Sequence, residues 1–280
     1  MYTTLIDIEE LQEKYCKDSW VIIDCRFYLK NEQLGYENYL QSHIPGAVYA
    51  NLNIDLSGIT TLKSGRHPLP NMQDFCTTLG LWGIDQTKQV VVYDDNGGAI
   101  SSRLWWMLRY LQHQQVAVLN GGWTHWQQKK YSVESGLQKN KKTEFVGKPK
   151  KQKKLSLQEV VNNRHHYVLV DSRSTKRYNG EQEPIDPIAG HIPGAINYCH
   201  ENNVDAEKIF LSQQQLHKNF GCLLNNTSPE KVVFYCGSGV TACRNILAME
   251  HIGKKGAKLF VGSWSEWCRN SELPIATNKS

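Results

Sequence analysis

The chain repeats one series of short motifs about 145 residues apart, which is the length of a whole domain and not of a solenoid repeat. An apolar run that ends in an acidic residue, a small residue and an arginine occurs at residues 21–26 and again at 168–173. A His-Ile-Pro-Gly-Ala segment follows in each half, and a Gly-x-Trp-x-x-Trp segment, starting at Gly121 and Gly262, comes last. The repeat therefore limits the chain to two domains of similar fold.

Within each copy, apolar strand-like runs alternate with stretches of helical periodicity. Residues 101–111 and 157–163 have helical spacing, and Ser156 is a suitable N-cap for the second of these. Alternation of this kind predicts an α/β fold in which each domain is a mostly parallel sheet with helices on both faces. In such sheets the functional crevice lies beyond the carboxyl ends of the strands.

The predicted boundary between the domains is rich in lysine. Lys139 to Lys154 contains eight lysines and much of the excess in the net charge of +5. Few aromatic residues interrupt the lysines and no groove-reading motif accompanies them, which favours a solvated linker over nucleic-acid binding. We therefore expect an N-terminal domain at residues 1–135, a basic linker at 136–154 and a C-terminal domain at 155–280. A mildly positive surface would still attract small anionic substrates.

Other classes of protein are disfavoured by absences in the sequence. No apolar run approaches the roughly 20 residues of a membrane span, and the N-terminus lacks a basic region followed by an apolar core, so we expect neither a membrane protein nor a signal peptide. A cytoplasmic location is the default expectation. The eight cysteines form no close CxxC pairs, which argues against a metal site and predicts free thiols.

One of these cysteines lies where nucleophilic chemistry is expected. Cys236 ends the apolar run at 232–235 and precedes a loop of glycines and hydroxyl residues, after which a helix is predicted to begin near Thr241. Glycines let such a loop curl so that successive backbone N–H groups point inward, and a helix N-terminus adds to the positive potential. The arrangement favours a thiolate, or a sulfur carried on it, at Cys236.

These motifs together resemble the tandem-domain rhodanese family of sulfurtransferases. The resemblance covers nearly the whole chain and rests on the paired His-Ile-Pro-Gly-Ala segments, the loop at 236–242 and the Gly-Ser-Trp-Ser-Glu-Trp segment at 262–267. The loop is most similar to that of 3-mercaptopyruvate sulfurtransferases, because thiosulfate-using rhodaneses typically carry basic side chains after the cysteine. The resemblance implies a catalytic C-terminal domain and an inactive N-terminal domain, where Asp94 matches Cys236 and cannot carry a persulfide.

The resemblance also implies roles for individual residues. Cys236 is the predicted nucleophile, and Ser238, His67 and Asp55 would form a proton relay, the acid and the imidazole coming from the N-terminal half. Arg177 matches the arginine that grips the substrate carboxylate. The remaining predicted substrate-binding residues are Arg173, Gly237, Gly239, Val240 and Thr241.

One departure from the family pattern concerns substrate binding. Mercaptopyruvate enzymes carry a second clamping arginine shortly after a Glu-Pro pair, whereas here Glu183-Pro184 is followed by Ile185. The missing arginine favours thiosulfate as the sulfur donor, while the loop favours 3-mercaptopyruvate.

The predicted function is sulfur transfer from 3-mercaptopyruvate, through a Cys236 persulfide, to a thiol such as thioredoxin or to cyanide, with no metal or organic cofactor. A thiosulfate sulfurtransferase is the alternative. A non-catalytic sulfur-carrier or binding module is a more remote one. A phosphatase with a similar cysteine loop would need an arginine six residues after the cysteine, where this chain has Ala242.

Overall fold

The computed structural model describes residues 1–15 and 18–278 and divides into two compact units. The first unit comprises Met1–Gly58, Leu69–Lys150 and Ala206–Phe210, and the second comprises Ile59–Pro68, Lys151–Asp205 and Leu211–Ser280. Each unit contains one five-stranded sheet whose pairings are all parallel. The predicted α/β class, with two similar sheets flanked by helices, is confirmed.

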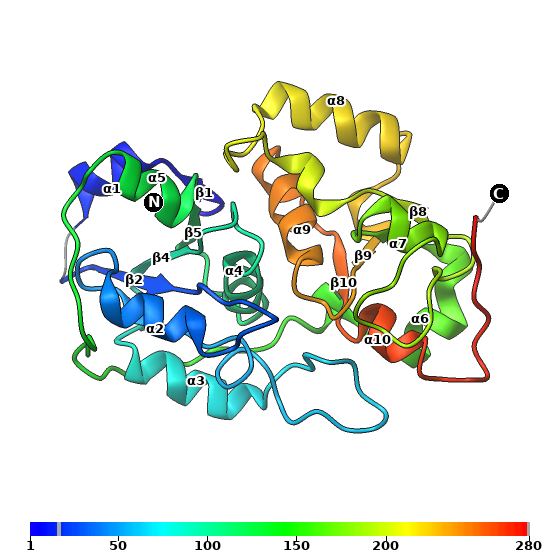
Figure 1. The fold of residues 1–280 in the computed structure, drawn as a ribbon, viewed down its shortest axis with the longest axis horizontal. Helices are drawn as coiled ribbons and strands as arrows, with labels where there is room; N and C mark the ends of the chain where they lie inside the picture. The colour runs from blue at the N-terminus through cyan, green and yellow to red at the C-terminus, as the bar shows by residue number, and fades with distance from the viewer. Residues whose placement is uncertain (16–17, 279–280) are drawn as a thin grey trace. The chain divides into compact units, whose positions relative to one another are not determined.

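In the first unit the strands lie in the order β1-β5-β4-β2-β3. The central strand β4 is buried along its whole length, which is why its sequence is almost continuously apolar and does not alternate. The strands are β1 (Leu5–Ile6), β2 (Trp20–Asp24), β3 (Val48–Tyr49), β4 (Gln89–Tyr93) and β5 (Val116–Leu119). The helices are α1 (Ile8–Lys14), α2 (Leu34–Gln41), α3 (Met72–Leu81), α4 (Ser101–Tyr110) and α5 (Gly122–Gln128) (Figure 1).

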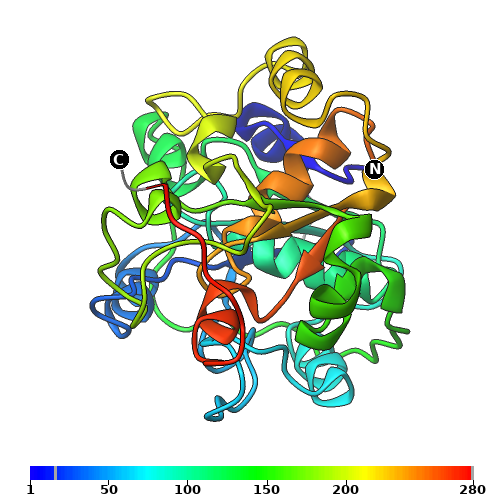
Figure 2. The ribbon, with the colours of Figure 1, turned by 90° about the vertical axis from the view of Figure 1, so that its right-hand side faces the viewer.

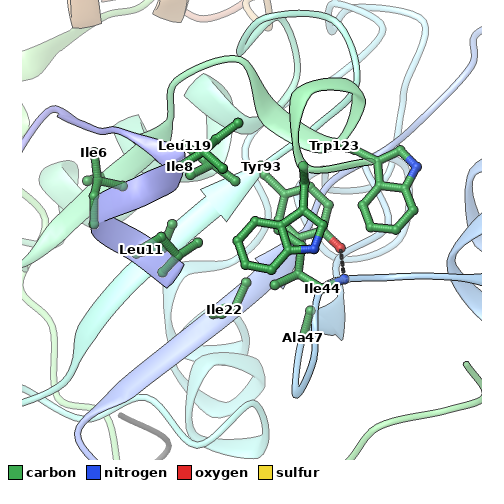
Figure 3. Packing of buried hydrophobic residues seen from close by; sticks show 12 residues of the cluster. Ile6, Ile8, Leu11, Ile22, Ile44, Ala47, Tyr93, Leu119 and Trp123 are labelled. Carbon is green, nitrogen blue, oxygen red and sulfur yellow. Dashed lines mark hydrogen bonds between the residues drawn. The ribbon is translucent and has the colours of Figure 1, made fainter. Parts of the chain in front are cut away.

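An apolar cluster between the sheet and its helices holds this unit together. Figure 3 shows its side chains around Tyr93, whose ring packs beside Trp123 at a centroid distance of 6.2 Å. The Tyr93 hydroxyl accepts a hydrogen bond from Ile44 N at 3.3 Å and donates one to Asp24 at 2.7 Å. The buried hydroxyl is therefore satisfied and ties the end of β4 to the His-Ile-Pro-Gly-Ala segment.

In the second unit the strands lie in the equivalent order, β6-β10-β9-β7-β8. The strands are β6 (Lys154–Leu155), β7 (Val168–Asp171), β8 (Ile196–Asn197), β9 (Val232–Tyr235) and β10 (Lys258–Phe260). The helices are α6 (Leu157–Asn163), α7 (Thr175–Asn179), α8 (Gln213–Leu224), α9 (Ala242–His251) and α10 (Ser263–Trp267), with short 3₁₀ turns at Lys151–Lys153, Arg164–His166, His200–Asn203 and Pro229–Lys231.

Local sequence signals set several of these boundaries. Ser156 caps α6 through a capping box with Glu159, as its spacing predicts. Helix α9 is buried from Ala242 to Glu250. The segment that follows α10, red in Figure 2, runs back to His191, whose backbone pairs with Ala276.

Two segments group with the opposite unit from the one that their position in the sequence suggests. Residues 59–68 follow β3 but group with the second unit, and residues 206–210 follow the 3₁₀ turn after β8 but group with the first. Residues 136–150 of the lysine-rich stretch lie along the first unit: Thr143 N donates to Gly80 O at 2.9 Å, and Phe145 is buried. The domain limits at 135 and 154 remain a prediction.

Within the part of the chain that the structure describes, no helix combines the length and apolar character needed to cross a membrane.

Candidate active site

The predicted nucleophile lies immediately beyond the carboxyl end of the central strand β9. Cys236 is buried, with 2% of its surface exposed. Gly239 N–H donates to its sulfur at 3.2 Å, and α9 begins directly after the loop, at Ala242 (Figure 1). Backbone N–H groups and a helix N-terminus both stabilise a negative charge at this place.

The loop conformation requires glycine at position 239. Gly239 has φ +73, and a Cβ there would overlap Val261 O. A side chain at this position would therefore be strained twice, once by the left-handed backbone and once by the contact.

A second segment braces the cysteine loop from β10 and α10. Trp264 N donates to Cys236 O and Ser265 N donates to Gly237 O, both at 2.9 Å. The Ser263 hydroxyl accepts from Cys236 N at 3.1 Å and donates to Phe260 O at 2.9 Å. Ser263 adopts φ +55, a conformation that few residues other than glycine take, which places its hydroxyl beside the nucleophile's backbone.

Ser238 and His67, two members of the predicted relay, are hydrogen-bonded to each other. Ser238 Oγ and His67 Nδ1 lie 2.7 Å apart, and both residues are buried. Because residues 59–68 belong to the second unit, His67 lies in the same compact body as Cys236 although it precedes it by most of the chain.

Residues 64–66, which directly precede His67, contact α10 and its neighbouring residues in the second unit. Arg66 N donates to Ser265 Oγ at 3.0 Å, and Arg269 Nη1 donates to Ser64 O at 3.0 Å. At Gly65 a Cβ would overlap Gly262 O, so only glycine permits this close approach.

The third predicted relay member belongs to the first unit. The Asp55 carboxylate accepts a hydrogen bond from Asn51 N at 2.7 Å, and burial raises the pKa of Asp55 even though that hydrogen bond opposes the shift. A role for Asp55 beside His67 stays a prediction.

The two predicted arginines differ in their surroundings. Arg173 is almost fully enclosed: its guanidinium pairs with Asp171 at 2.6 Å and with Glu183 at 3.2 Å, and it stacks over Trp264. Burial opposes its charge, yet the attraction of Asp171 raises the pKa of Arg173 overall. Arg173 thus holds neighbouring carboxylates in place, and we favour that role over direct contact with substrate.

Arg177 is more open and faces the cysteine loop. Its guanidinium donates to Glu183 at 2.7 and 3.0 Å and to Asp186 at 3.1 Å. A Cβ added at Gly237 would lie 3.4 Å from Arg177 Nη2. Glycine after the cysteine therefore leaves room for the guanidinium over the loop.

The first unit contains an equivalent loop, in which a carboxylate of the chain itself, that of Asp94, accepts the backbone hydrogen bonds. Asp94 follows β4 as Cys236 follows β9, and its carboxylate is buried. It accepts hydrogen bonds of 2.8–2.9 Å from the backbone N–H groups of Asn96, Gly98, Ile100 and Ser101. An internal carboxylate thus takes the place that a thiolate or persulfide would need.

Sequence reasoning missed two residues of this site, Arg66 and Ser263. Arg66 had a signal, since it directly precedes His67 in a loop already singled out. Ser263 had a weaker one, because Gly122 stands at the matching position of the first unit and also has a positive φ, +57.

The protein-family model of the rhodanese-like domain matches the sequence twice, at residues 7–129 and 156–270. The chain belongs to the rhodanese family. This rhodanese-family chain is 37% identical over 278 residues to a protein of Pseudomonas aeruginosa named "Probable 3-mercaptopyruvate sulfurtransferase", and the match covers 98% of each. It is 30% identical over 304 residues to a mitochondrial thiosulfate/3-mercaptopyruvate sulfurtransferase of Arabidopsis thaliana, covering 99% of this chain and 79% of that one.

Among solved structures, the chain is similar to the 3-mercaptopyruvate sulfurtransferase of Leishmania major. The TM-score is 0.88 at 29% sequence identity, and the match covers 98% of this chain and 76% of the other. The family predicted from the sequence motifs is thereby confirmed.

Proposed function

We propose that this protein is a sulfurtransferase that takes sulfur from 3-mercaptopyruvate, holds it as a persulfide on Cys236 and passes it to a thiol or to cyanide. The observation that carries the proposal is the 2.7 Å hydrogen bond that joins His67 to Ser238, which lies in the same loop as the buried Cys236. The names of the relatives from Pseudomonas aeruginosa and Leishmania major support the same donor.

The first step balances without any cofactor. The Cys236 thiolate attacks the thiol sulfur of 3-mercaptopyruvate, the carbon–sulfur bond breaks, and its electron pair goes to the methylene carbon. The proton of the substrate thiol ends on that carbon, so the products are the Cys236 persulfide anion and pyruvate. The Gly239 N–H and the N-terminus of α9, which favour a thiolate at Cys236, would favour the persulfide anion in the same way.

The proton must travel from sulfur to carbon, and Ser238 with His67 can carry it. If Nδ1 accepts from the Ser238 hydroxyl, His67 bears its own proton on Nε2. A carboxylate at Nε2 would fix that tautomer, which is the role proposed for Asp55. Arg177 is proposed to hold the substrate carboxylate, because a planar guanidinium fits a carboxylate in two-pronged fashion.

In the second step an acceptor thiolate attacks the outer sulfur of the persulfide and releases the Cys236 thiolate. Thioredoxin is a proposed acceptor, and cyanide would serve in the assay. We further propose a cytoplasmic site of action, because a reducing compartment keeps such cysteines as free thiols.

Thiosulfate is the second candidate donor. Ile185, which stands where a second clamping arginine is expected, favours thiosulfate, and the name of the Arabidopsis relative includes both donors. A steady-state comparison of sulfur transfer to cyanide from each donor separates the two. We expect a larger kcat/KM for 3-mercaptopyruvate, no activity in Cys236→Ser, and full activity in the exposed control Cys222→Ser. A larger kcat/KM for thiosulfate would overturn the donor assignment.

A further inference from the structure

Arg66 brings a second guanidinium to the cysteine loop. A Cβ built on Gly237 would lie 2.8 Å from Arg66 Nη2 and 3.4 Å from Arg177 Nη2. The residue next to the nucleophile is therefore flanked by two guanidinium groups, one from the loop that carries His67 and one from α7.

The two guanidinium groups already share a carboxylate. Asp186 pairs with Arg66 Nη1 and, through its other oxygen, with Arg177 Nη2 at 3.1 Å. Burial raises the pKa of Asp186, while Arg66 and Arg177 oppose that shift. The spacing of the two arginines is thus one that a single carboxylate can bridge.

Arg66 also has an unused donor. Its Nε is buried and has no hydrogen-bond partner among the residues that the structure describes. A buried donor without an acceptor costs free energy, and an oxygen atom of a ligand would remove that cost. The rest of the residue is held in place, because Arg66 N donates to Ser265 Oγ.

The expected position of a second clamp cannot supply this charge. Ile185 is 42% exposed and carries no charge. We propose that Arg66 replaces the missing arginine and, with Arg177, binds the carboxylate of the sulfur donor. This inference rests on the proposed function and deepens it, since it assigns the second carboxylate-binding residue. It also makes the absence of arginine at 185 compatible with a carboxylate donor.

Kinetics with 3-mercaptopyruvate provide the first test. We expect Arg66→Met to raise KM by about 10- to 100-fold, the worth of a charge-assisted hydrogen bond, with a smaller change in kcat. Arg66→Lys keeps the charge but loses the fork, so its KM should rise by less. The control is Lys63→Met, which removes one exposed cation from the same loop and should leave KM unchanged.

Alkylation of Cys236 tests the inference without relying on turnover. Iodoacetate carries a carboxylate and iodoacetamide does not, and peptide mass spectrometry reports the rate constant of each at Cys236. We expect Arg66→Met to lower the ratio of the iodoacetate rate constant to the iodoacetamide rate constant at least several-fold, while Lys63→Met keeps the wild-type ratio.

The two experiments fail in distinguishable ways. An unchanged ratio and KM in Arg66→Met, or an equal loss of reactivity toward both reagents, would overturn the role of Arg66. If the ratio falls but the wild type forms no pyruvate from 3-mercaptopyruvate, the carboxylate site stands and the proposed donor is wrong.

Discussion

Ser238 and His67 come from distant parts of the sequence, yet their side chains are hydrogen-bonded to each other and connect the cysteine loop to a titratable group. Their hydrogen bond of 2.7 Å is buried, so solvent competes little with it. At the scale of single residues, we propose that this pair carries the proton that the reaction must move, while Cys236 acts as the nucleophile.

Removing the Ser238 hydroxyl should slow the chemistry and not the folding. We expect Ser238→Ala to lower kcat about 100-fold or more, the usual worth of positioned proton transfer, with little change in thermal midpoint. His67→Ala should have a similar effect. The double variant should lose little more than either single one, because the two act as a unit. Fully additive losses in kcat would contradict the relay, and Ser271→Ala serves as an exposed control.

Glu183 pairs with both Arg173 and Arg177, and its ionisation should make the stability of the protein depend on pH. Burial raises the pKa of Glu183, but the hydrogen bonds and the charge of Arg177, together with the backbone N–H groups of Asp186 and Ile185, outweigh burial and lower that pKa below the ordinary 4.5. A lowered carboxyl pKa adds stability above the ordinary value, and that stability is lost as the pH falls through the folded-state pKa.

Glu183→Gln should therefore be less stable than wild type at pH 7, by about 2 kcal/mol or more for a buried pair broken on one side. The difference should shrink as the pH drops below about 4.5. Urea denaturation of both proteins between pH 3 and 7 measures it. A difference that stays constant with pH would mean that the charge of Glu183 is not what stabilises the protein.

At the scale of elements, the cysteine loop depends on α10 and the turn before it. Ser263 adopts a strained backbone conformation with positive φ, and in this conformation its hydroxyl accepts a hydrogen bond from the buried Cys236 N–H. The first unit has Gly122 at the matching position, also with a positive φ, and there Trp123 N donates to Asp94 O at 2.9 Å. The Gly-x-Trp-x-x-Trp motif thus braces the loop in both units.

Two variants of Ser263 should rank in a definite order. Ser263→Ala keeps the strained backbone and leaves the Cys236 N–H without an acceptor, so we expect a loss of about 1–3 kcal/mol. Ser263→Gly loses the same hydrogen bond but relieves the backbone strain, and its stability should lie between alanine and wild type. Denaturant unfolding gives the order, and an alanine variant as stable as wild type would exclude the bracing role.

At the scale of the whole molecule, the two units share one fold but differ in the residue that follows the central strand, which is Asp94 in the first and Cys236 in the second. In the first unit the carboxylate of Asp94 accepts the loop's backbone hydrogen bonds, and in the second unit the sulfur of Cys236, the proposed nucleophile, follows the equivalent strand. A duplicated domain can in this way keep one copy for stability and one for chemistry.

Asp94→Ala should expose this division. The change leaves buried backbone N–H groups without an acceptor, and we expect a loss of stability of about 3 kcal/mol or more. Sulfur transfer per folded molecule should stay close to wild type at a temperature where the variant is folded. Thermal denaturation and steady-state rates measure the two effects. A loss of kcat as large as that of Cys236→Ser would refute the claim that Asp94 serves stability and not chemistry.

The sequence predicted the parts of the molecule that depend on local patterns. Apolar runs such as 232–235 identified buried parallel strands, and Ser156 identified the start of α6. Local patterns did not predict that residues 59–68 would pack with the second unit, because that depends on contacts such as Gly65 against Gly262. Only the family resemblance implied that His67 would meet Ser238. The position of Arg66 over Gly237 follows from the same packing and was missed for the same reason.

The central claim is best tested by a single turnover without acceptor. The protein is mixed with 3-mercaptopyruvate, and pyruvate and intact mass are measured together. We predict one pyruvate per chain and one added sulfur atom, located on Cys236 by peptide mass spectrometry, with neither product in Cys236→Ser. Pyruvate formation without sulfur on Cys236, or sulfur on another cysteine, would contradict the proposed mechanism.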